Sequence, residues 1–214
     1  MISFRTVLFD LDGTLLNTLG DLTDSVNHVL KAYGYPLRRE EEIRRFLGNG
    51  SRNLITLSLP EGVDPQIVEK VHDDYLAWYG PHSQIRTAPY EGIPELLDRL
   101  QEQGIRMAVI SNKGDGQVKP LTEKYFPQIG LALGERVGIP KKPNPESIFE
   151  ALRQLGEDPS TAIYVGDSEV DVETAKNAGI PSIAVGWGFR DRDELMECKP
   201  DHFIEHPLDL LKLK

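Results

Sequence analysis

The sequence predicts an α/β protein, a doubly wound parallel sheet with a helical domain inserted after its first strand. The first observation is a set of short, unbroken apolar runs, which are typical of strands buried on both faces of a parallel sheet. The second is that helical patterns alternate with these runs from about Tyr90 onward. The third is a purely helical pattern between Leu16 and about Ser83, which interrupts the alternation.

The apolar runs give the expected strands. Four strong runs each stop at an Asp, Ser or Gly, and they lie at residues 6–9, 106–110, 162–165 and 182–185. A weaker run stops at Gly134, and a short one precedes the last segment, so two further strands are expected at residues 129–133 and 202–204. Such strands predict a sheet that helices cover on both faces.

Helical patterns fill the segments between the strands. Three of them end at a glycine, the usual C-terminal stop of a helix: residues 93–100 before Gly104, 148–155 before Gly156 and 172–178 before Gly179. The inserted region carries three helical patterns, and the last begins at Asp64-Pro65, a capping residue followed by proline at the first position. We therefore expect an α/β core of residues 1–15 and 84–214 and a helical cap of residues 16–83.

Composition limits the partners and the compartment. The 214 residues carry a formal net charge of −10, and such an acidic surface repels nucleic acid and anionic membranes, so neither is expected as a partner. The same charge repels phosphorylated metabolites, so any phosphate site would have to be a local positive spot made by Lys and a metal. Cys198 is the only cysteine, which excludes an intrachain disulfide. With no signal peptide or membrane-spanning run recognisable, we expect a cytoplasmic protein. The sequence leaves monomer and homodimer open.

Polar residues gather where the expected strands end. Asp10 and Asp12 follow the first strand, Ser111 to Lys113 follow the second, and Asp167 follows a later one. Because ligands of open parallel sheets bind at the carboxyl ends of the strands, we expect these residues to converge. Each segment also has an ordinary explanation, since Asp and Gly suit tight turns and Ser and Asn cap helices. Their combination at successive strand ends favours a shared active site.

Four segments of the sequence form a recognisable set. They are Phe9-Asp10-Leu11-Asp12-Gly13-Thr14-Leu15, Ser111-Asn112-Lys113, Lys142 in Lys-Pro-Asn-Pro-Glu, and Gly166-Asp167-Ser168-Glu169-Val170-Asp171. Together they resemble the motifs of the haloacid dehalogenase superfamily. They occur in the family's order and cover essentially the whole chain, so the resemblance is highly specific. It implies a Rossmann-like core with a helical cap inserted after the first motif.

The resemblance implies a reaction for the matched aspartates. Asp10 would be the nucleophile that forms an aspartyl-phosphate, since a carboxylate is ionised at neutral pH and needs no activating base. Asp12 would be the general acid and base. Mg²⁺ would bind the Asp10 carboxylate, the Asp12 backbone carbonyl and Asp167, while Asp171 would be a less direct ligand or would hold a metal-bound water.

The resemblance also implies a phosphate site. Lys142 would offset the repulsion between an anionic nucleophile and an anionic phosphoryl group. The Ser111 hydroxyl would donate a hydrogen bond to a phosphate oxygen. Backbone N–H groups of the segment from Leu11 to Gly13 and of Asn112 would supply further donors.

These roles predict a Mg²⁺-dependent phosphomonoester hydrolase acting on a small phosphorylated metabolite. The likeness to phosphoglycolate phosphatases rests on Asp-Gly-Thr-Leu and on residues 46–50 and 187–190, and it favours 2-phosphoglycolate. Two alternatives stay open: a sugar phosphomutase or other phosphotransferase using the same aspartates, and a promiscuous phosphatase of sugar phosphates, nucleotides or pyrophosphate. Thr14 stands where phosphomutases often carry an apolar residue, which disfavours the first.

Three further residues have open roles. Lys113 either orients the site or pairs with a carboxylate. Arg52 faces either a substrate carboxylate or solvent, and Trp187 forms either the edge of a lid or simple packing.

Overall fold

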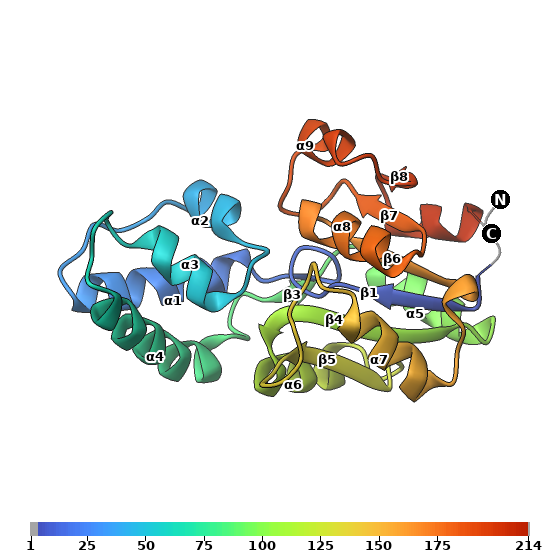
Figure 1. Cartoon of the computed structure of the whole chain (residues 1–214), viewed down its shortest axis with the longest axis horizontal. Helices are drawn as coiled ribbons and strands as arrows, with labels where there is room; N and C mark the ends of the chain where they lie inside the picture. The colour runs from blue at the N-terminus through green and yellow to red at the C-terminus, as the bar shows by residue number, and fades with distance from the viewer. Residues whose placement is uncertain (1–3, 214) are drawn as a thin grey trace. The chain divides into compact units, whose positions relative to one another are not determined.

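The computed structural model describes residues 4–213, which divide into two compact units (Figure 1). The helical unit is Asn17–Ala88, and the core unit comprises the described residues up to Leu16 and from Pro89 onward. A separate two-stranded sheet is formed by β2 (Leu16–Asn17) and β3 (Ala88–Pro89). Within residues 4–213, no helix has both the length and the apolar character needed to cross a membrane.

The return boundary between the units falls at Pro89, later than the expected residue 84. The reason lies in Asp21, a buried residue of the helical unit that holds the intervening segment. Its carboxylate accepts hydrogen bonds from the backbone N–H groups of Ile85, Arg86 and Thr87, at 3.1, 2.8 and 2.9 Å. Residues 85–87 are therefore structurally part of the helical unit.

Six strands of the core unit form one parallel sheet. In their order across the sheet they are β5 (Leu131–Glu135), β4 (Arg106–Gly114), β1 (Thr6–Phe9), β6 (Ala162–Gly166), β7 (Ser182–Val185) and β8 (His202–Ile204). This confirms the predicted α/β class. Along the chain, β4 and β5 are added on one side of β1, and β6, β7 and β8 are then added on the other side. The strand order therefore reverses at β1, and open α/β sheets bind their ligands at such a point.

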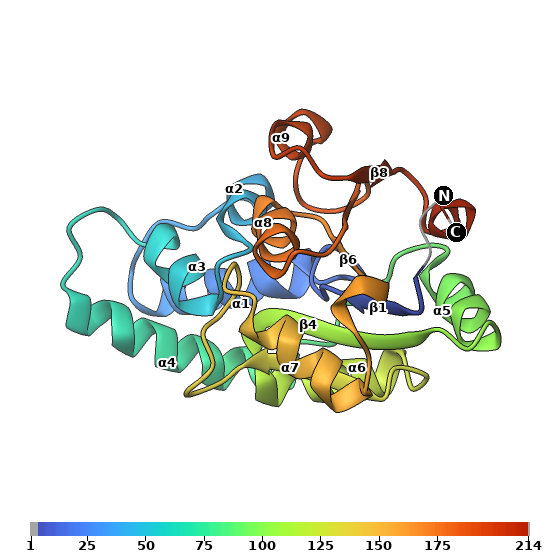
Figure 2. The same ribbon diagram turned by 45° about the vertical axis from the view of Figure 1, so that its right-hand side comes forward.

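Alternate residues of β1 face opposite sides of the sheet, and both sides are covered by helices (Figure 2). Val7 and Phe9 pack in one apolar cluster and Leu8 packs in the other. The first cluster includes residues of α5 (Ile93–Glu102), α6 (Asp115–Tyr125) and the short helix η2 (Pro207–Lys212), and the second includes residues of α7 (Glu146–Leu155) and α8 (Glu169–Ala178). The unit also contains η1 (Pro159–Thr161) and α9 (Arg192–Glu197).

The core unit matches most of the expected element ends. Helices α7 and α8 end before Gly156 and Gly179, which adopt the left-handed conformation as predicted. Strand β4 continues beyond its expected end, because Gly114 pairs with Glu135 of β5 after a register shift. Helix α6 lies outside the expected helices, since Pro120 interrupts its sequence pattern.

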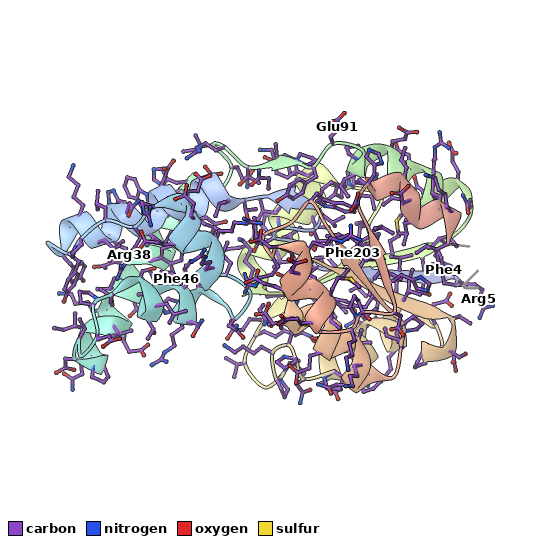
Figure 3. All side chains as sticks on the ribbon, turned by 90° about the horizontal axis from the view of Figure 1, so that it is seen from above. Phe4, Arg5, Arg38, Phe46, Glu91 and Phe203 are labelled. Atoms are coloured by element: carbon purple, nitrogen blue, oxygen red, sulfur yellow. The ribbon has the colours of Figure 1, made fainter. Side chains whose placement is uncertain are left out.

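The helical unit contains α1 (Leu19–Ala32), α2 (Glu40–Phe46), α3 (Ser51–Ser58) and α4 (Pro65–His82). The predicted start of the last helix is confirmed, because the Asp64 side chain accepts a hydrogen bond from the Gln66 backbone N–H at 2.8 Å. Helix α3 adds to the three expected helices. Arg38, labelled in Figure 3, lies between α1 and α2, and it joins that segment to the end of α3 by donating from Nε to the Ser58 carbonyl at 2.8 Å.

Candidate active site

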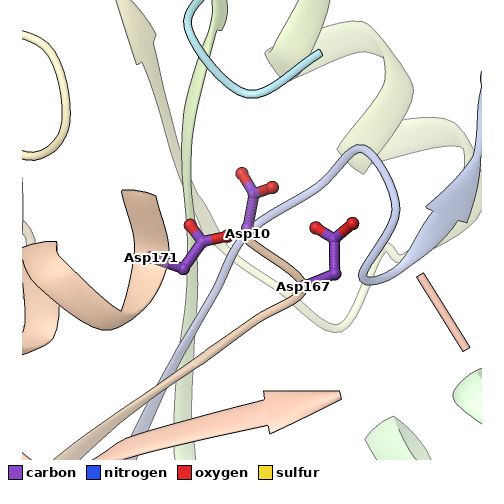
Figure 4. A group of neighbouring side chains, drawn as sticks. All are labelled: Asp10, Asp167 and Asp171. Carbon is purple, nitrogen blue, oxygen red and sulfur yellow. The ribbon is translucent and has the colours of Figure 1, made fainter. Parts of the chain in front are cut away.

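Three carboxylates meet at the carboxyl ends of β1 and β6. Asp10 directly follows β1, Asp167 directly follows β6, and Asp171 lies in the first turn of α8. One oxygen from each residue lies within 4.8 Å of the others, and all three residues are buried (Figure 4). The convergence predicted for Asp10 and Asp167 therefore occurs, and the sheet topology brings together residues that are far apart in sequence.

Asp171 is oriented by the turn that precedes it. Its Oδ2 accepts hydrogen bonds from the Ser168 backbone N–H at 3.0 Å and from the Ser168 hydroxyl at 2.6 Å. This is a capping box at the start of α8, so ordinary helix chemistry fixes one oxygen of Asp171. The other oxygen, Oδ1, accepts a hydrogen bond from Lys142 at 2.7 Å.

Lys142 supplies the positive charge of this cluster. Its ammonium Nζ donates to Asp10 Oδ1 at 2.8 Å, to Asp171 Oδ1 at 2.7 Å and to the Tyr164 hydroxyl at 3.1 Å. These three contacts match the three hydrogens of an ammonium. The sequence indicated the lysine, but nothing local to Tyr164 distinguishes it from an ordinary apolar strand residue.

Asn112 holds the main chain of Lys142. The Lys142 backbone N–H donates to Asn112 Oδ1 at 2.8 Å, and Asn112 Nδ2 donates to the Lys142 carbonyl at 3.0 Å. The side-chain amide thereby fixes both polar groups of one residue. Asn112 was expected near the phosphate through its backbone, and the structure adds this second contribution through its side chain.

Asp12 lies outside the group of three carboxylates and has its own cation. Lys113 Nζ donates to both oxygens of the Asp12 carboxylate, at 2.9 Å each. Ser111, which is buried beside them, accepts a hydrogen bond from the Lys113 backbone N–H at 3.2 Å through its hydroxyl oxygen. Lys113 thus pairs with a carboxylate, which is one of its two expected roles.

The turn after β1 packs against Asp167. The Thr14 hydroxyl donates to Asp167 Oδ1 at 3.2 Å, and the Phe189 backbone N–H donates to Asp167 Oδ2 at 2.7 Å. Trp187 Nε1 donates to the Thr14 carbonyl at 2.9 Å, so Trp187 supports this turn.

Gly13 belongs to the same turn, and its backbone N–H has a partner other than the expected phosphate. Its backbone N–H donates to the Leu16 carbonyl at 2.9 Å, so this group closes the turn and is not presented to a phosphate. Gly13 has a φ of 87°, and a Cβ there would lie 2.2 Å from Asp167 Oδ2. Glycine is needed because of the left-handed backbone and the close approach. Leu11, whose backbone N–H is expected to face the phosphate, anchors the turn with a side chain buried in the main apolar cluster.

Burial and mutual repulsion shape the electrostatics of the cluster. Burial, reinforced by the Asp171 charge, raises the pKa of Asp10 to about 7 despite the attraction of Lys142. Burial and the charges of Asp171 and Asp10 raise the pKa of Asp167 well above its usual value. Although burial disfavours its ammonium, the charges of Asp10 and Asp171 raise the pKa of Lys142. Two of the three carboxylates, Asp10 and Asp171, share the Lys142 ammonium, and a bound cation would relieve the repulsion among all three.

The oxygen-only donor set suits a hard divalent cation. Carboxylates are the protein ligands that Mg²⁺ and Ca²⁺ prefer, and Asp10, Asp167 and Asp171 offer three of them from three different segments. The residues present therefore fit a metal ion at this position.

The two glycines of the segment 46–50, which the resemblance to phosphoglycolate phosphatases singles out, lie in the loop between α2 and α3. Gly48 and Gly50 have φ values of 110° and 85°, conformations that glycine adopts without strain. Arg52 donates from Nε to Glu69 Oε1 at 2.7 Å, and both side chains are exposed. Arg52 is therefore engaged on the surface of the helical unit.

Comparison with known proteins shows that the chain is similar to proteins named as phosphatases. A family model described as haloacid dehalogenase-like hydrolase matches residues 7–185. The chain is 31% identical to N-acetylmuramic acid 6-phosphate phosphatase of Pseudomonas aeruginosa, over 97% of this chain and 93% of that protein. It is 34% identical to phosphoglycolate phosphatase of Mesorhizobium japonicum, over 94% and 90%. A solved structure from Lactobacillus delbrueckii subsp. bulgaricus, provisionally named phosphoglycolate phosphatase, superposes with a TM-score of 0.94 at 32% identity, over 99% and 98%.

Proposed function

We propose that this chain, which belongs to the haloacid dehalogenase-like hydrolase family as its four motifs predicted, hydrolyses small phosphomonoesters through a covalent phosphate on Asp10. Family membership makes the chain a hydrolase, and its relatives carry the names of phosphatases. One observation carries the proposal. A buried carboxylate at the end of the central strand contacts a buried ammonium and lies beside two more carboxylates that suit a metal ion.

The first half-reaction would use Asp10 and Asp12. A carboxylate oxygen of Asp10 attacks phosphorus, and the bond between phosphorus and the ester oxygen breaks. Asp12 donates its proton to that departing oxygen, so that an alcohol leaves and an aspartyl-phosphate remains. Lys142 would offset the charge on the phosphoryl group, with the Ser111 hydroxyl as a further hydrogen-bond donor.

The second half-reaction would restore the enzyme. Asp12, now a carboxylate, takes a proton from a water molecule whose oxygen attacks phosphorus. The bond between phosphorus and the Asp10 oxygen breaks, which releases inorganic phosphate and the free Asp10 carboxylate.

We assign the metal to Mg²⁺, held by Asp10, Asp167, the Asp12 backbone carbonyl and, directly or through water, Asp171. The fit of the donor set supports this assignment. When bound, Mg²⁺ would supply positive charge that lowers the repulsion between nucleophile and phosphate.

We also propose that the helical unit serves as a cap that selects the substrate. Its insertion supports this role, because Asn17–Ala88 follows directly on the turn that carries Asp10 and Asp12. A mobile cap would exclude water during the reaction.

The names of the relatives suggest two substrates. 2-Phosphoglycolate is the first candidate, and N-acetylmuramic acid 6-phosphate, a sugar phosphate, is the second. A phosphomutase would use the same aspartates, but Thr14 disfavours it, since its hydroxyl is engaged with Asp167 where mutases often carry an apolar side chain.

The test is phosphate release from a panel of phosphomonoesters that contains both candidates, with Mg²⁺ and with EDTA. Mg²⁺-dependent release that strongly favours one ester supports both the reaction and that substrate. Release of an isomeric sugar phosphate in place of free phosphate would support the mutase. The absence of release from every ester, in the presence of Mg²⁺, would contradict the proposal.

A further inference from the structure

We infer that Lys113 is a positioning residue for Asp12, which it holds in the orientation needed to protonate the leaving group. The inference rests on the proposed function, in which Asp12 is the general acid. The motif places Lys113 near the site without giving it a task. The structure shows its ammonium on both oxygens of Asp12, at 2.9 Å each.

Strand register brings the two residues together. Strands β1 and β4 run parallel with Phe9 opposite Val109, so the residues that follow Phe9 lie beside those that follow Val109. Asp12 and Lys113 are therefore neighbours across the central strand pair, although they are distant in sequence.

The backbone of Lys113 has close neighbours at both its N–H and its carbonyl. Its N–H donates to the Ser111 hydroxyl oxygen at 3.2 Å. At the carbonyl, a Cβ on Gly134 of β5 would lie 2.6 Å from the Lys113 oxygen, so glycine permits a close approach there. A backbone held in this way gives the lysine side chain a defined origin.

The burial of this ion pair favours a functional role over a stabilising one. The Lys113 side chain is 5% exposed and that of Asp12 is 18% exposed. Removing two charges from water costs free energy that their attraction repays only in part, so a buried pair is poor evidence for stability. The pair between Lys119 and Asp115 on the next helix lies outside the candidate site, and its lysine is 59% exposed. It therefore serves as a surface pair for comparison with the pair of Lys113 and Asp12.

The two buried lysines have separate tasks. Lys142 contacts Asp10 and Asp171, whereas Lys113 contacts Asp12. A cation on both oxygens fixes the plane of the Asp12 carboxyl group, which a contact to one oxygen would leave free to rotate. When Asp12 gives its proton to the leaving oxygen, it becomes the carboxylate that Lys113 holds in this structure.

The leaving group provides the test. An alkoxide is strongly basic and needs a proton as it departs, whereas p-nitrophenolate is a weak base and departs without one. The ratio kcat/KM reports the steps up to the first irreversible one, here departure of the alcohol or phenol, so later hydrolysis of the phosphoenzyme does not enter. The two substrates are 2-phosphoglycolate, or the alkyl ester of the panel that the wild-type enzyme hydrolyses fastest, and p-nitrophenyl phosphate.

Lys113→Met should lower kcat/KM for the alkyl ester by roughly 10–100-fold, part of the 10²–10⁴ that a general acid contributes. For p-nitrophenyl phosphate the loss should stay below about 3-fold, because little proton transfer is needed. Lys113→Arg should recover most of the alkyl-ester activity, since a guanidinium can also contact both oxygens. Lys119→Met is the matched control and should leave both ratios unchanged.

A double-mutant cycle completes the design. If Lys113 acts through Asp12, the variant that combines Lys113→Met with Asp12→Asn should be no slower on the alkyl ester than Asp12→Asn alone. Circular dichroism checks the fold, and Lys113→Gln replaces Lys113→Met should the latter fail to fold. Equal losses on both esters in a folded variant, or additive losses in the cycle, would overturn the inference. Inactivity of the wild-type enzyme on every ester would instead refute the proposed function.

Discussion

The two units of the molecule bury aspartates in different surroundings. In the helical unit, Asp21 accepts hydrogen bonds from three backbone N–H groups and from the Thr87 hydroxyl, so its charge is met by neutral donors. In the core unit, Asp10 lies beside Asp167 and Asp171, with a lysine shared between two of the three. The difference teaches that burial alone does not identify a catalytic carboxylate. Repulsion between neighbouring carboxylates that no cation fully relieves is a much better indication of a catalytic site.

The ion pairs at the candidate site differ from surface pairs of the helical unit in the same sense. In the helical unit, the pairs of Arg52 with Glu69 and of Arg86 with Asp24 involve exposed side chains. At the candidate site, Lys142 and Lys113 are buried, and the side chains of their carboxylate partners are at most 18% exposed. Exposed pairs contribute little to stability, whereas groups held out of water have strong electrostatic effects on a reaction.

The largest expected effect comes from matched substitutions of the two kinds of aspartate. Asp10→Asn should lower kcat/KM by about 10⁴-fold or more, because it removes the proposed nucleophile. Asp21→Asn should leave the turnover of folded protein nearly unchanged and lower the free energy of unfolding by about 2 kcal/mol, since an amide replaces an acceptor of several hydrogen bonds. Phosphate release and urea unfolding measure the two effects.

A circular dichroism spectrum of Asp10→Asn should equal that of the wild type. Near-normal turnover in that variant would refute the aspartyl-phosphate mechanism. A loss of activity in folded Asp21→Asn as large as in Asp10→Asn would abolish the distinction between the units.

The next effect concerns pH and metal. Burial raises the pKa of Asp10 from 3.8 to about 7, so between these values the folded protein keeps a proton that the unfolded chain has released. The free energy of unfolding of the metal-free protein should therefore fall as pH rises from about 4 to about 7. The proposed Mg²⁺ would bind the deprotonated carboxylates. At about 100 times its Kd, it should raise Tm by roughly 5–10 °C at pH 8 and by much less at pH 5.

Thermal unfolding at both pH values, with Mg²⁺ or with EDTA, measures this effect. The Asp21→Asn variant serves as the control and should keep the Mg²⁺-dependent rise in Tm, because Asp21 is not part of the cluster. An equal rise at both pH values would contradict competition between protons and metal at Asp10.

A smaller effect is expected from the Tyr164 hydroxyl of the core unit, with the Tyr33 hydroxyl of the helical unit as its comparison. Tyr164→Phe removes a hydrogen-bond acceptor of Lys142, and a hydrogen bond of this kind contributes about 1 kcal/mol. If the lost bond raises the reaction barrier by that amount, kcat should fall by roughly 3–10-fold. Tyr33→Phe, in the helical unit, removes the hydrogen bond to Asp74 that raises the pKa of Tyr33 to about 12. It should leave kcat unchanged. Steady-state kinetics of both variants decide the comparison, and equal effects would remove Tyr164 from the support of Lys142.

The smallest effect is expected at Arg52. Because its guanidinium pairs with Glu69 on the surface, Arg52→Met should change Tm by no more than about 1 °C. It should also leave the KM for 2-phosphoglycolate unchanged relative to that for glycerol phosphate, which has no carboxylate. A rise in KM confined to 2-phosphoglycolate would assign Arg52 to the substrate and would give the helical unit a direct part in recognition.

Much of the core could be predicted from sequence because its signals are local. The run of residues 6–9 is followed at once by Asp10, and strand polarity alone then places Asp10 at the carboxyl edge of the sheet. The end of α8 was predictable for the same reason, since Gly179 lies next to the last helical residue. Helix α6 was not predictable, because tertiary packing of Val118 and Leu121 outweighs an internal proline.

The sequence by itself determined the fold class, the order of the four motifs and the identity of the charged residues at the strand ends. Only the tertiary structure decided how these charges pair: Lys142 with Asp10 and Asp171, and Lys113 with Asp12. It also made Tyr164 and Asn112 supports of Lys142. The physical reason is that a strand end is specified by neighbouring residues, whereas each of these contacts depends on the register of separate strands and the path of a loop between them.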